Sequence, residues 1–289
     1  MIKKKAFAKL NLALHVIGER SKDEYFPERF INCQISLFDE LFLKTSKKNI
    51  EIACANPLVT NDKDNFIYKA ALLLRQIKGN RNLGAKITLK KNIPIKVGLG
   101  GGSTDGAAAL QGLSELWEIR LKDSQTLEMA RKLGKDFYYC LFGGLAQVLG
   151  EGKNFNVISI SSQLPEFWLL IVIPHEEKPS TGWMYEHLNT KDIGRNLNKF
   201  EKLKEAISQD NRKDILKNLH NDFENSVISF YPVVGNIKND LLKVGASAAL
   251  MAGSGLSVAG FFDNREKATL AKNKLEGKYK QIIITKPVS

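Results

Sequence analysis

Apolar and polar positions alternate most clearly in residues 7–16. A period of two predicts a half-buried β-strand, because successive side chains of a strand point to opposite faces. The apolar face begins at Leu10 and repeats at every second residue. The opposite, more polar face consists of Lys9, Asn11, Ala13 and His15. The pattern therefore predicts that Lys9 and Asn11 project side by side from one strand.

Similar patterns predict the other elements. In the first half of the chain we expect strands at residues 32–37, 40–45, 50–55 and 85–90, and helices at 65–77, 107–116 and 124–133. Ser124 is the expected N-cap of the last helix and Gly134 its C-terminal stop. In the second half we expect strands at 168–173, 246–251, 256–262 and 281–285, with helices at 233–243 and 265–275. This order is a split β-α-β pattern of the ferredoxin-like kind.

Length and composition favour two α+β domains, which we place at residues 1–155 and 156–289. A chain of 289 residues with 43% hydrophobic content exceeds the usual size of one domain and can form a full core. No stretch approaches the roughly 20 apolar residues that span a bilayer. Three widely spaced cysteines, Cys33, Cys54 and Cys140, argue against a disulfide framework or a structural zinc site. We therefore expect a cytoplasmic protein without a membrane partner.

The net charge of +12 has two interpretations. The lysines are spread along the whole chain, and no segment combines basic residues with interleaved aromatic ones, which favours an ordinary solvated surface. A nucleic acid, or a polyanionic small substrate such as a nucleotide, would also match the charge.

Residues 94–109 carry the most specific signal. Four glycines lie within five positions, at 98 and 100–102, directly before a predicted helix. Glycine allows a backbone with positive φ to approach a ligand closely, and N–H groups at a helix start can bind phosphate. The segment lacks the Gly-Lys-Ser/Thr ending of a Walker A loop, and Ser103 stands where a dinucleotide fingerprint has its last glycine. The alternative is a flexible turn without a ligand.

At these residues the chain resembles the GHMP kinase family, which includes galactokinase and the homoserine, mevalonate and phosphomevalonate kinases. Other segments resemble that family in the same order along the chain. They are residues 8–14 with Lys9 and Asn11, residues 133–136 ending in Asp136, residues 179–185 with Thr181 and Tyr185, residues 221–224, and residues 251–255 around Gly253. The resemblance covers nearly the whole chain, and its glycine segment is most similar to the members that phosphorylate a cytidine-diphosphate-linked methylerythritol.

The resemblance implies a two-domain GHMP kinase fold, with an N-terminal domain like domain 2 of ribosomal protein S5 and a ferredoxin-like C-terminal domain. It implies ATP, together with Mg²⁺, as the cofactor, and phosphorylation of the 2-hydroxyl of 4-diphosphocytidyl-2-C-methyl-D-erythritol in the non-mevalonate isoprenoid pathway. Asp136 would act as the base and Lys9 would hold the hydroxyl and offset phosphoryl charge. The implied ATP-binding residues are Pro94, Lys96, Gly98, Leu99, Gly100, Gly101, Gly102, Ser103, Thr104, Asn65 and Lys69. The implied acceptor-binding residues are Asn11, Tyr25, Phe26, Asp136, Thr181, Tyr185 and Gly253, with Tyr25 and Tyr185 stacking on cytosine.

The chain departs from the family pattern at three places. Asp23-Glu24-Tyr25-Phe26 stands where the family usually has Asp-Gly-Tyr-His, Phe137-Tyr138-Tyr139-Cys140 replaces Val-Pro-Phe-Phe, and Lys96 replaces a small residue. If the family imidazole reads cytosine, Phe26 changes substrate choice. If backbone groups read it, Phe26 is tolerated.

Two other functions stay open. One is a different GHMP kinase, with a homoserine-type or mevalonate-type acceptor, which would not need Tyr25 and Tyr185 together. The other is a non-catalytic RNA-binding module, which would not need Lys9, Asp136 and several glycine turns together. We expect a small-molecule partner rather than nucleic acid, and a monomer or weak homodimer.

Overall fold

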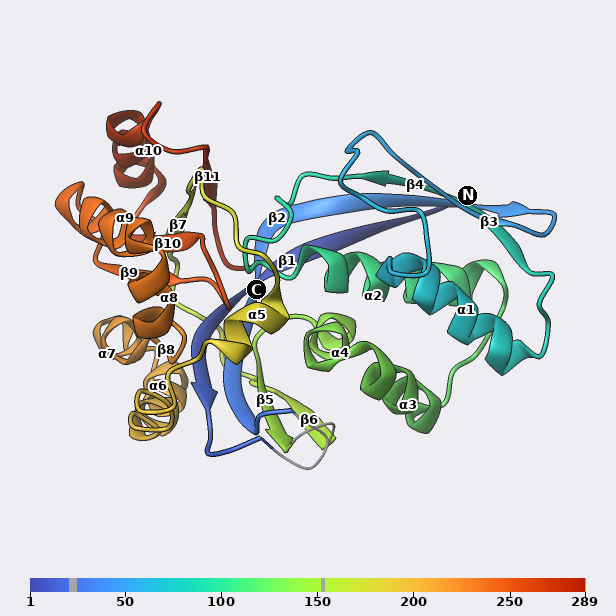
Figure 1. Ribbon diagram of the computed structural model, residues 1–289, viewed down its shortest axis with the longest axis horizontal. Coiled ribbons are helices and arrows are strands. Elements are labelled where there is room, and N and C mark those ends of the chain that lie inside the picture. Colours follow the sequence, from blue (N-terminus) through green and yellow to red (C-terminus); the bar gives the residue numbers. More distant parts are fainter. Residues whose placement is uncertain (21–24, 152–153, 289) are drawn as a thin grey trace. The chain divides into compact units, whose positions relative to one another are not determined.

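The computed structural model describes residues 1–20, 25–151 and 154–288, and the chain forms two compact units (Figure 1). The first unit comprises Met1–Ala8, Leu37–Ile95 and Gly100–Gly143, and the second comprises Lys9–Ser36, Lys96–Leu99 and Gly144–Ser289. Two long strands, β1 and β2, contribute residues to both units. The domain boundary expected at residue 155 stays a prediction.

The sheet of the first unit is built on β1 (Ile2–Val16) and β2 (Glu28–Ser46). Strand β4 (Gly84–Lys90) runs antiparallel to the second half of β2, and β3 (Ile50–Cys54) runs parallel to β4. The prediction of separate strands at 32–37 and 40–45 was wrong, because β2 continues through Asp39. The Asp39 carboxylate is fully buried and accepts hydrogen bonds from the backbone N–H groups of Asn92 and Ile93, so a charged residue does not end the strand.

Four helices of the first unit lie on one face of these strands (Figure 1). Their bounds are α1 Phe66–Lys78, α2 Gly101–Leu116, α3 Asp123–Leu133 and α4 Lys135–Phe142. Helices α1 and α2 pack closely at Gly106, where an added β-carbon would lie 2.6 Å from Cβ of Phe66. The N-cap expected at Ser124 was wrong, because α3 already begins after Lys122. The stop expected at Gly134 is confirmed, with φ of 109°.

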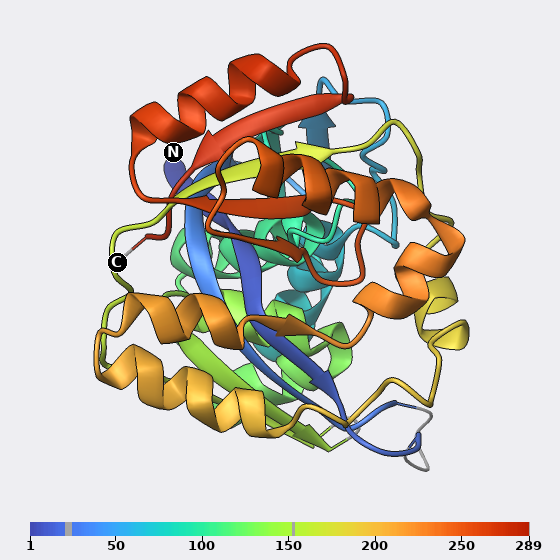
Figure 2. The ribbon, with the colours of Figure 1, turned by 90° about the vertical axis from the view of Figure 1, so that its left-hand side faces the viewer.

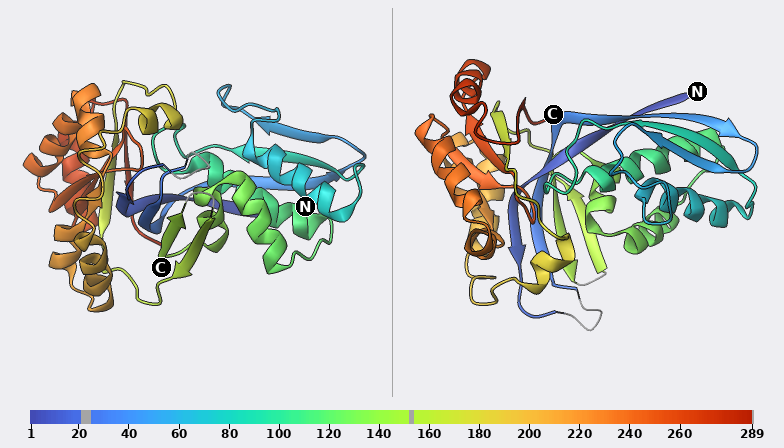
Figure 3. Two further views of the ribbon diagram at one scale, coloured as in Figure 1. Left: turned by 60° about the horizontal axis from the view of Figure 1, so that its bottom comes forward. Right: turned by 45° about the horizontal axis from the view of Figure 1, so that its top comes forward.

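Two short strands, β5 (Ala146–Glu151) and β6 (Asn154–Ser159), pair antiparallel in the second unit (Figure 3). Strand β5 also pairs with the first residues of β2, from Glu28 to Asn32. Neither strand was predicted from the sequence, because Gly150 and the polar residues after it interrupt the apolar pattern. On the other side, β8 (His220–Asn221) runs parallel to β1, with Ala13 opposite His220.

A second sheet of the second unit has four antiparallel strands, in the order β11-β7-β10-β9. Its strands are β7 Trp168–Ile173, β9 Ala248–Met251, β10 Val258–Phe262 and β11 Gln281–Thr285. Numbered along the chain, this order is 4-1-3-2, so the predicted ferredoxin-like arrangement is confirmed. Helices α9 (Pro232–Lys243) and α10 (Arg265–Leu275) cover one face of the sheet (Figure 2).

The remaining helices of this unit connect β7 to α9. They are α5 Thr181–Glu186, α6 Asn198–Ser208, α7 Arg212–Asn218 and α8 Glu224–Phe230. Ser180 is the N-cap of α5, since its Oγ accepts a hydrogen bond from Trp183 N at 3.0 Å. Among the described residues, none of the helices is both long and apolar enough to cross a membrane.

Candidate active site

The glycine segment forms the first turn of a helix. The sequence predicted that the helix would begin at residue 107, and this was wrong: α2 begins at Gly101, with Gly100 as its N-cap at φ of 71°. Glycine has low helix propensity, but the first turn needs few helical hydrogen bonds. The N–H groups of Gly101, Gly102 and Ser103 therefore lie at the positive end of a 16-residue helix. An anion is the ligand that this arrangement favours.

The residues just before the helix form an irregular turn. Pro94 is half-buried, Leu99 is buried, and Lys96 is exposed with a left-handed φ of 62°. A non-glycine residue in this conformation carries strain of roughly 1 kcal/mol or more. Thr104 is buried in α2, where its N–H donates to the carbonyl of Gly100 at 2.9 Å.

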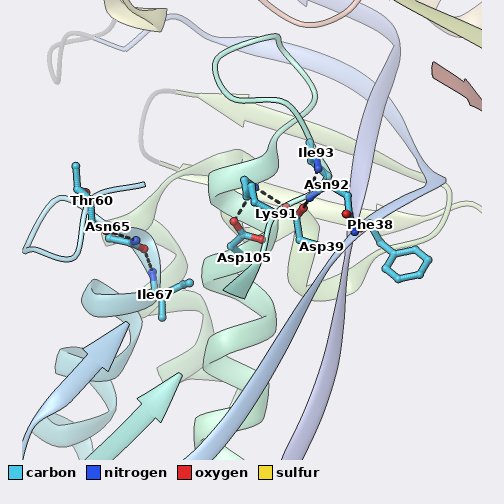
Figure 4. A network of polar contacts seen from close by, with 9 residues as sticks. All are labelled: Phe38, Asp39, Thr60, Asn65, Ile67, Lys91, Asn92, Ile93 and Asp105. Atoms are coloured by element: carbon cyan, nitrogen blue, oxygen red, sulfur yellow. Dashed lines mark hydrogen bonds and ion pairs between the residues drawn. The ribbon is translucent and has the colours of Figure 1, made fainter. Parts of the chain in front are cut away.

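A buried ion-pair network lies directly under the glycine turn (Figure 4). Lys91 Nζ donates to Asp105 Oδ2 at 2.8 Å and also to a carboxylate oxygen of Asp39. All three side chains are at most 6% exposed. A β-carbon on Gly101 would lie 2.9 Å from Lys91 Nζ. The network thus ties β2 and the segment after β4 to the first turns of α2. None of its three members was predicted from the sequence.

The charges in this network do not balance, since two carboxylates share one ammonium. Burial raises the pKa of Asp105 well above its usual value, and Asp39 raises it further, while Lys91 opposes both. Burial alone would lower the pKa of Lys91, but Asp105 and Asp39 raise it above its usual value. Lys91 therefore stays charged, and Asp105 holds a proton more readily than an ordinary aspartate.

Asn65 and Lys69 lie at the start of α1. Asn65 is the N-cap: its side-chain oxygen accepts a hydrogen bond from Ile67 N at 2.8 Å, and its amide donates to the carbonyl of Thr60 at 2.7 Å (Figure 4). Lys69 Nζ lies 5.2 Å from the ring centroid of Phe66. Asn65 thus fixes the loop before α1, and the adenine contacts expected for both residues stay predictions.

Asp136 is the second residue of α4 and lies in its first turn, after Gly134. Its side chain is half-buried. Asp136 belongs to the first unit and Lys9 to the second, so the pairing expected between them stays a prediction.

Lys9 begins a chain of buried polar side chains in the second unit. Its Nζ donates to Asn11 Oδ1 at 2.7 Å, and Asn11 Nδ2 donates to Asn32 Oδ1 at 2.6 Å. The exposed fractions are 4%, 2% and 0% along this chain. Because an ammonium can only donate, it fixes the orientation of both amides. The Asn32 amide nitrogen has no partner within the described residues and is a donor available to a ligand. The predicted neighbourhood of Lys9 and Asn11 is confirmed, whereas Asn32 was missed.

Two glycine turns meet in the second unit. Gly98 and Gly253 have φ of 90° and 54°, and a β-carbon on Gly253 would lie 2.9 Å from the carbonyl oxygen of Gly98 and 3.4 Å from Asn11 Oδ1. Asn221 holds the second turn, because its amide donates to the carbonyls of Met251 and Gly253 at 2.9 and 2.7 Å. The expected site residues Asn11, Gly98 and Gly253 are therefore neighbours.

Aromatic side chains form a group near β2. Phe26 and Tyr185 lie nearly parallel, with ring centroids 6.1 Å apart and planes inclined by 22°. The Tyr185 hydroxyl donates to a carboxylate oxygen of Glu28. Tyr25 is 50% exposed and next to Phe26 in the chain. The expected aromatic residues thus include one pair in contact and one exposed ring.

Thr181, the first residue of α5, is exposed. Asp23 and Glu24, where the chain departs from the family pattern, lie outside the described residues.

Comparisons with known proteins agree with this arrangement. The family profile for the GHMP kinases N terminal domain matches residues 65–144, and the profile for the GHMP kinases C terminal matches residues 196–281. The chain is 38% identical over 285 residues to a 4-diphosphocytidyl-2-C-methyl-D-erythritol kinase of Caldicellulosiruptor bescii, covering 98% of this chain and 97% of that protein. It is 35% identical over 293 residues to a protein of the same name from Clostridium botulinum, with 98% and 99% covered.

Solved structures show the same fold. A 4-(cytidine 5'-diphospho)-2C-methyl-D-erythritol kinase superposes with a TM-score of 0.81 at 25% identity, covering 100% of both chains. An L. major mevalonate kinase, in complex with R-mevalonate, superposes with a TM-score of 0.75 at 15% identity, covering 99% of this chain and 96% of that one. Both halves of this protein, with its glycine turns and its ferredoxin-like sheet, therefore belong to the GHMP kinase family.

Proposed function

We propose that this chain transfers the terminal phosphoryl group of ATP to the 2-hydroxyl of 4-diphosphocytidyl-2-C-methyl-D-erythritol, in the non-mevalonate route to isoprenoid precursors. The observation that carries this proposal is similarity over nearly the whole chain to kinases of that name, at 38% identity for the Caldicellulosiruptor bescii protein. The buried polar chain that begins at Lys9 would suit the polyol part of the acceptor. The aromatic group around Tyr185 would suit its cytosine.

The start of α2 supports the ATP part of the proposal. Gly101 and Gly102 carry no side chain that would separate their N–H groups from a phosphate, and the helix dipole favours negative charge there. Magnesium bound with ATP would neutralise phosphate charge, as in other phosphoryl transfers. Pro94 and Leu99 shape the turn, while Asn65 and Lys69 would border the adenine.

Lys9 and Asp136 have the central roles in the proposed reaction. Asn11 orients the Lys9 ammonium, which would hold the acceptor hydroxyl and stabilise charge on the transferred phosphoryl group. Asp136 would accept the hydroxyl proton. The Asn32 amide nitrogen would donate to an oxygen of the acceptor.

The aromatic group would bind the cytosine. Tyr185 is held by Glu28, so its ring is oriented before the ligand arrives. A base stacked between two parallel rings needs faces about 7 Å apart, twice the van der Waals spacing. Phe26 and Tyr185 are already stacked on each other, so the base would enter only if the two rings moved apart, or it would stack on the exposed Tyr25 ring. Phe26 offers a face but no hydrogen-bond donor, so backbone groups would read the cytosine edge.

The proposal also includes a cytoplasmic location, where ATP is available, and a monomer or weak homodimer. The test is an ADP-release assay with four acceptors: the cytidylated methylerythritol, the same polyol phosphate without the cytidylyl group, homoserine and mevalonate. We expect turnover only with the first. Turnover with homoserine or mevalonate instead would identify another GHMP kinase, and RNA affinity that falls with salt, without ATP turnover, would identify a binding module.

A further inference from the structure

Two histidines and an aspartate gather at the end of β1, in the second unit. His15 lies near the end of β1, His220 lies in β8, and Asp222 follows directly after β8. One possible ligand atom from each residue lies within 4.8 Å of the other two. The two imidazole rings are stacked, with centroids 4.7 Å apart and planes inclined by 23°. His220 Nε2 lies 2.6 Å from Asp222 Oδ1.

His15 has an unusual environment for a polar side chain. It is 0% exposed, and within residues 1–20, 25–151 and 154–288 neither of its ring nitrogens has a hydrogen-bond partner. A buried polar group without a partner costs roughly 1–3 kcal/mol, so such a group points to a ligand. An imidazole in such a place can offer a nitrogen lone pair to a metal ion.

Asp222 is held in place by the backbone. Its Oδ2 accepts hydrogen bonds from Val16 N at 2.8 Å and from Gly194 N at 3.3 Å, while its Oδ1 faces His220. Such outer contacts orient a carboxylate for metal binding. Its negative charge favours a cation, and Lys199 and Arg29, which lie close enough to lower the pKa of His15, oppose one.

We propose that His15, His220 and Asp222 bind a divalent transition-metal ion of the zinc type, with a water molecule as the fourth ligand. Two imidazoles and one carboxylate suit zinc, whereas magnesium prefers oxygen ligands, so this site differs from that of the magnesium that accompanies ATP. Tetrahedral zinc with bonds of 2.0–2.2 Å needs ligand atoms about 3.3 Å apart. The ligand atoms must therefore approach by up to about 1.5 Å from their present separation of at most 4.8 Å, and one imidazole must turn out of the stacked arrangement. The ion must also replace the proton between His220 and Asp222.

The site goes beyond the proposed kinase function, because its role would be structural. A bound ion would link β1, which carries His15, to β8, which carries His220. Asn221, which holds the glycine turn at Gly253, lies between His220 and Asp222 in the sequence. An ion at this place would therefore stabilise the strand that positions that turn. Since His220 has 15% of its side chain exposed, an ion can reach the cluster from solvent.

The test uses the full chain after treatment with a chelator, titrated with Zn²⁺ or Co²⁺. We expect one equivalent to bind, Co²⁺ to show the intense visible absorption of four-coordinate cobalt, and Mg²⁺ not to compete. His15→Leu and Asp222→Asn should each weaken binding by about 100-fold or more, since each removes a ligand of the ion. Asp222→Asn keeps an oxygen for Val16 and Gly194, so the fold should survive.

The matched control is the double variant His175→Ala and His187→Ala, which removes the other two histidines of the chain and should leave the affinity unchanged. A crystal soaked in Zn²⁺ gives a test without substitutions, with an anomalous peak expected between His15 and Asp222. The proposal is overturned if wild-type protein shows no four-coordinate Co²⁺ spectrum, if His15→Leu binds as tightly as wild type, or if the peak lies at His175 or His187.

Discussion

Gly98 lies so close to Ala252 that a β-carbon on Gly98 would overlap the carbonyl oxygen of Ala252 and lie 2.8 Å from its carbonyl carbon. Both residues belong to the second unit, so this contact joins the start of the glycine segment to the turn at Gly253. Gly102 differs, because among the described residues an added β-carbon there would meet only the Phe66 ring, at 3.5 Å, an ordinary contact. The fold therefore requires a glycine at position 98, whereas packing does not explain the glycine at position 102.

Gly98→Ala and Gly102→Ala should consequently separate stability from ATP binding. Gly98→Ala should lower the free energy of unfolding by on the order of 3 kcal/mol, through overlap and an unfavourable positive φ. Gly102→Ala should change it by less than about 1 kcal/mol, since alanine favours a helix. It should nevertheless weaken ATP binding at least tenfold, because its methyl group would stand among the N–H groups of the first turn. Urea unfolding and ATP calorimetry measure the two effects, and unchanged ATP affinity in Gly102→Ala would contradict the loop assignment.

Asp136→Asn should abolish turnover and leave ATP binding nearly intact. An amide cannot accept the hydroxyl proton, and loss of a general base costs about 10²–10⁴-fold in rate. The measurement is kcat from ADP release, with ATP affinity by calorimetry. Asp123→Asn is the matched control, because Asp123 also lies in the first turn of a helix of the same unit but is exposed. Full activity in Asp136→Asn would exclude the proposed base.

Glu28→Gln should weaken binding of the acceptor and leave binding of ATP unchanged. The Glu28 carboxylate accepts the hydrogen bond of the Tyr185 hydroxyl, and a neutral amide oxygen holds it less firmly. We expect KM for the cytidylated acceptor to rise about 5- to 20-fold while KM for ATP stays constant, since this loss corresponds to about 1–2 kcal/mol. Tyr185→Phe removes the same hydrogen bond and should behave alike. A rise in KM for ATP, or none for the acceptor, would show that this pair does not serve cytosine binding.

Local patterns were sufficient for the most regular elements. Strand β7 and helix α10 have the predicted bounds, because an uninterrupted apolar run marks the strand and Asn264 caps the helix through Lys267 N. Helix α2 was predicted six residues too short, since glycine propensity argues against a helix that tertiary contacts at Gly101 and Gly106 support.

The candidate site was predictable only where its residues are neighbours along one element. Alternation in β1 placed Lys9 beside Asn11, and the structure has them hydrogen-bonded. Asn32 lies 21 residues from Asn11, on another strand. Its contact therefore depends on how the two strands pair, which the alternation within one strand does not predict. Lys91 was missed for the same reason, because its two carboxylates lie 52 and 14 residues away and nothing local marks it as buried.

The ion-pair network at Lys91 should make the free energy of unfolding depend on pH. The pKa of Asp105 in the folded protein is raised, so the folded state binds a proton more tightly than the unfolded chain, whose aspartate titrates near 3.9. The folded state then holds more protons, and the free energy of unfolding falls as pH rises from about 4 through the raised pKa. The raised pKa of Lys91 acts only above its usual value of 10.5, outside this window.

Asp105→Asn should remove this part of the pH dependence. The amide carries no charge at any pH and leaves Lys91 paired with Asp39 alone. Relative to wild type, the variant should gain stability as pH rises from about 4 to 8, because it lacks the carboxyl group whose raised pKa destabilises the wild-type fold over this range. Urea unfolding of both proteins across this range gives the difference. Asp123→Asn, at an exposed position, should show no such trend, and a difference that is flat or falls with pH in Asp105→Asn would mean that Asp105 is an ordinary ionised carboxylate.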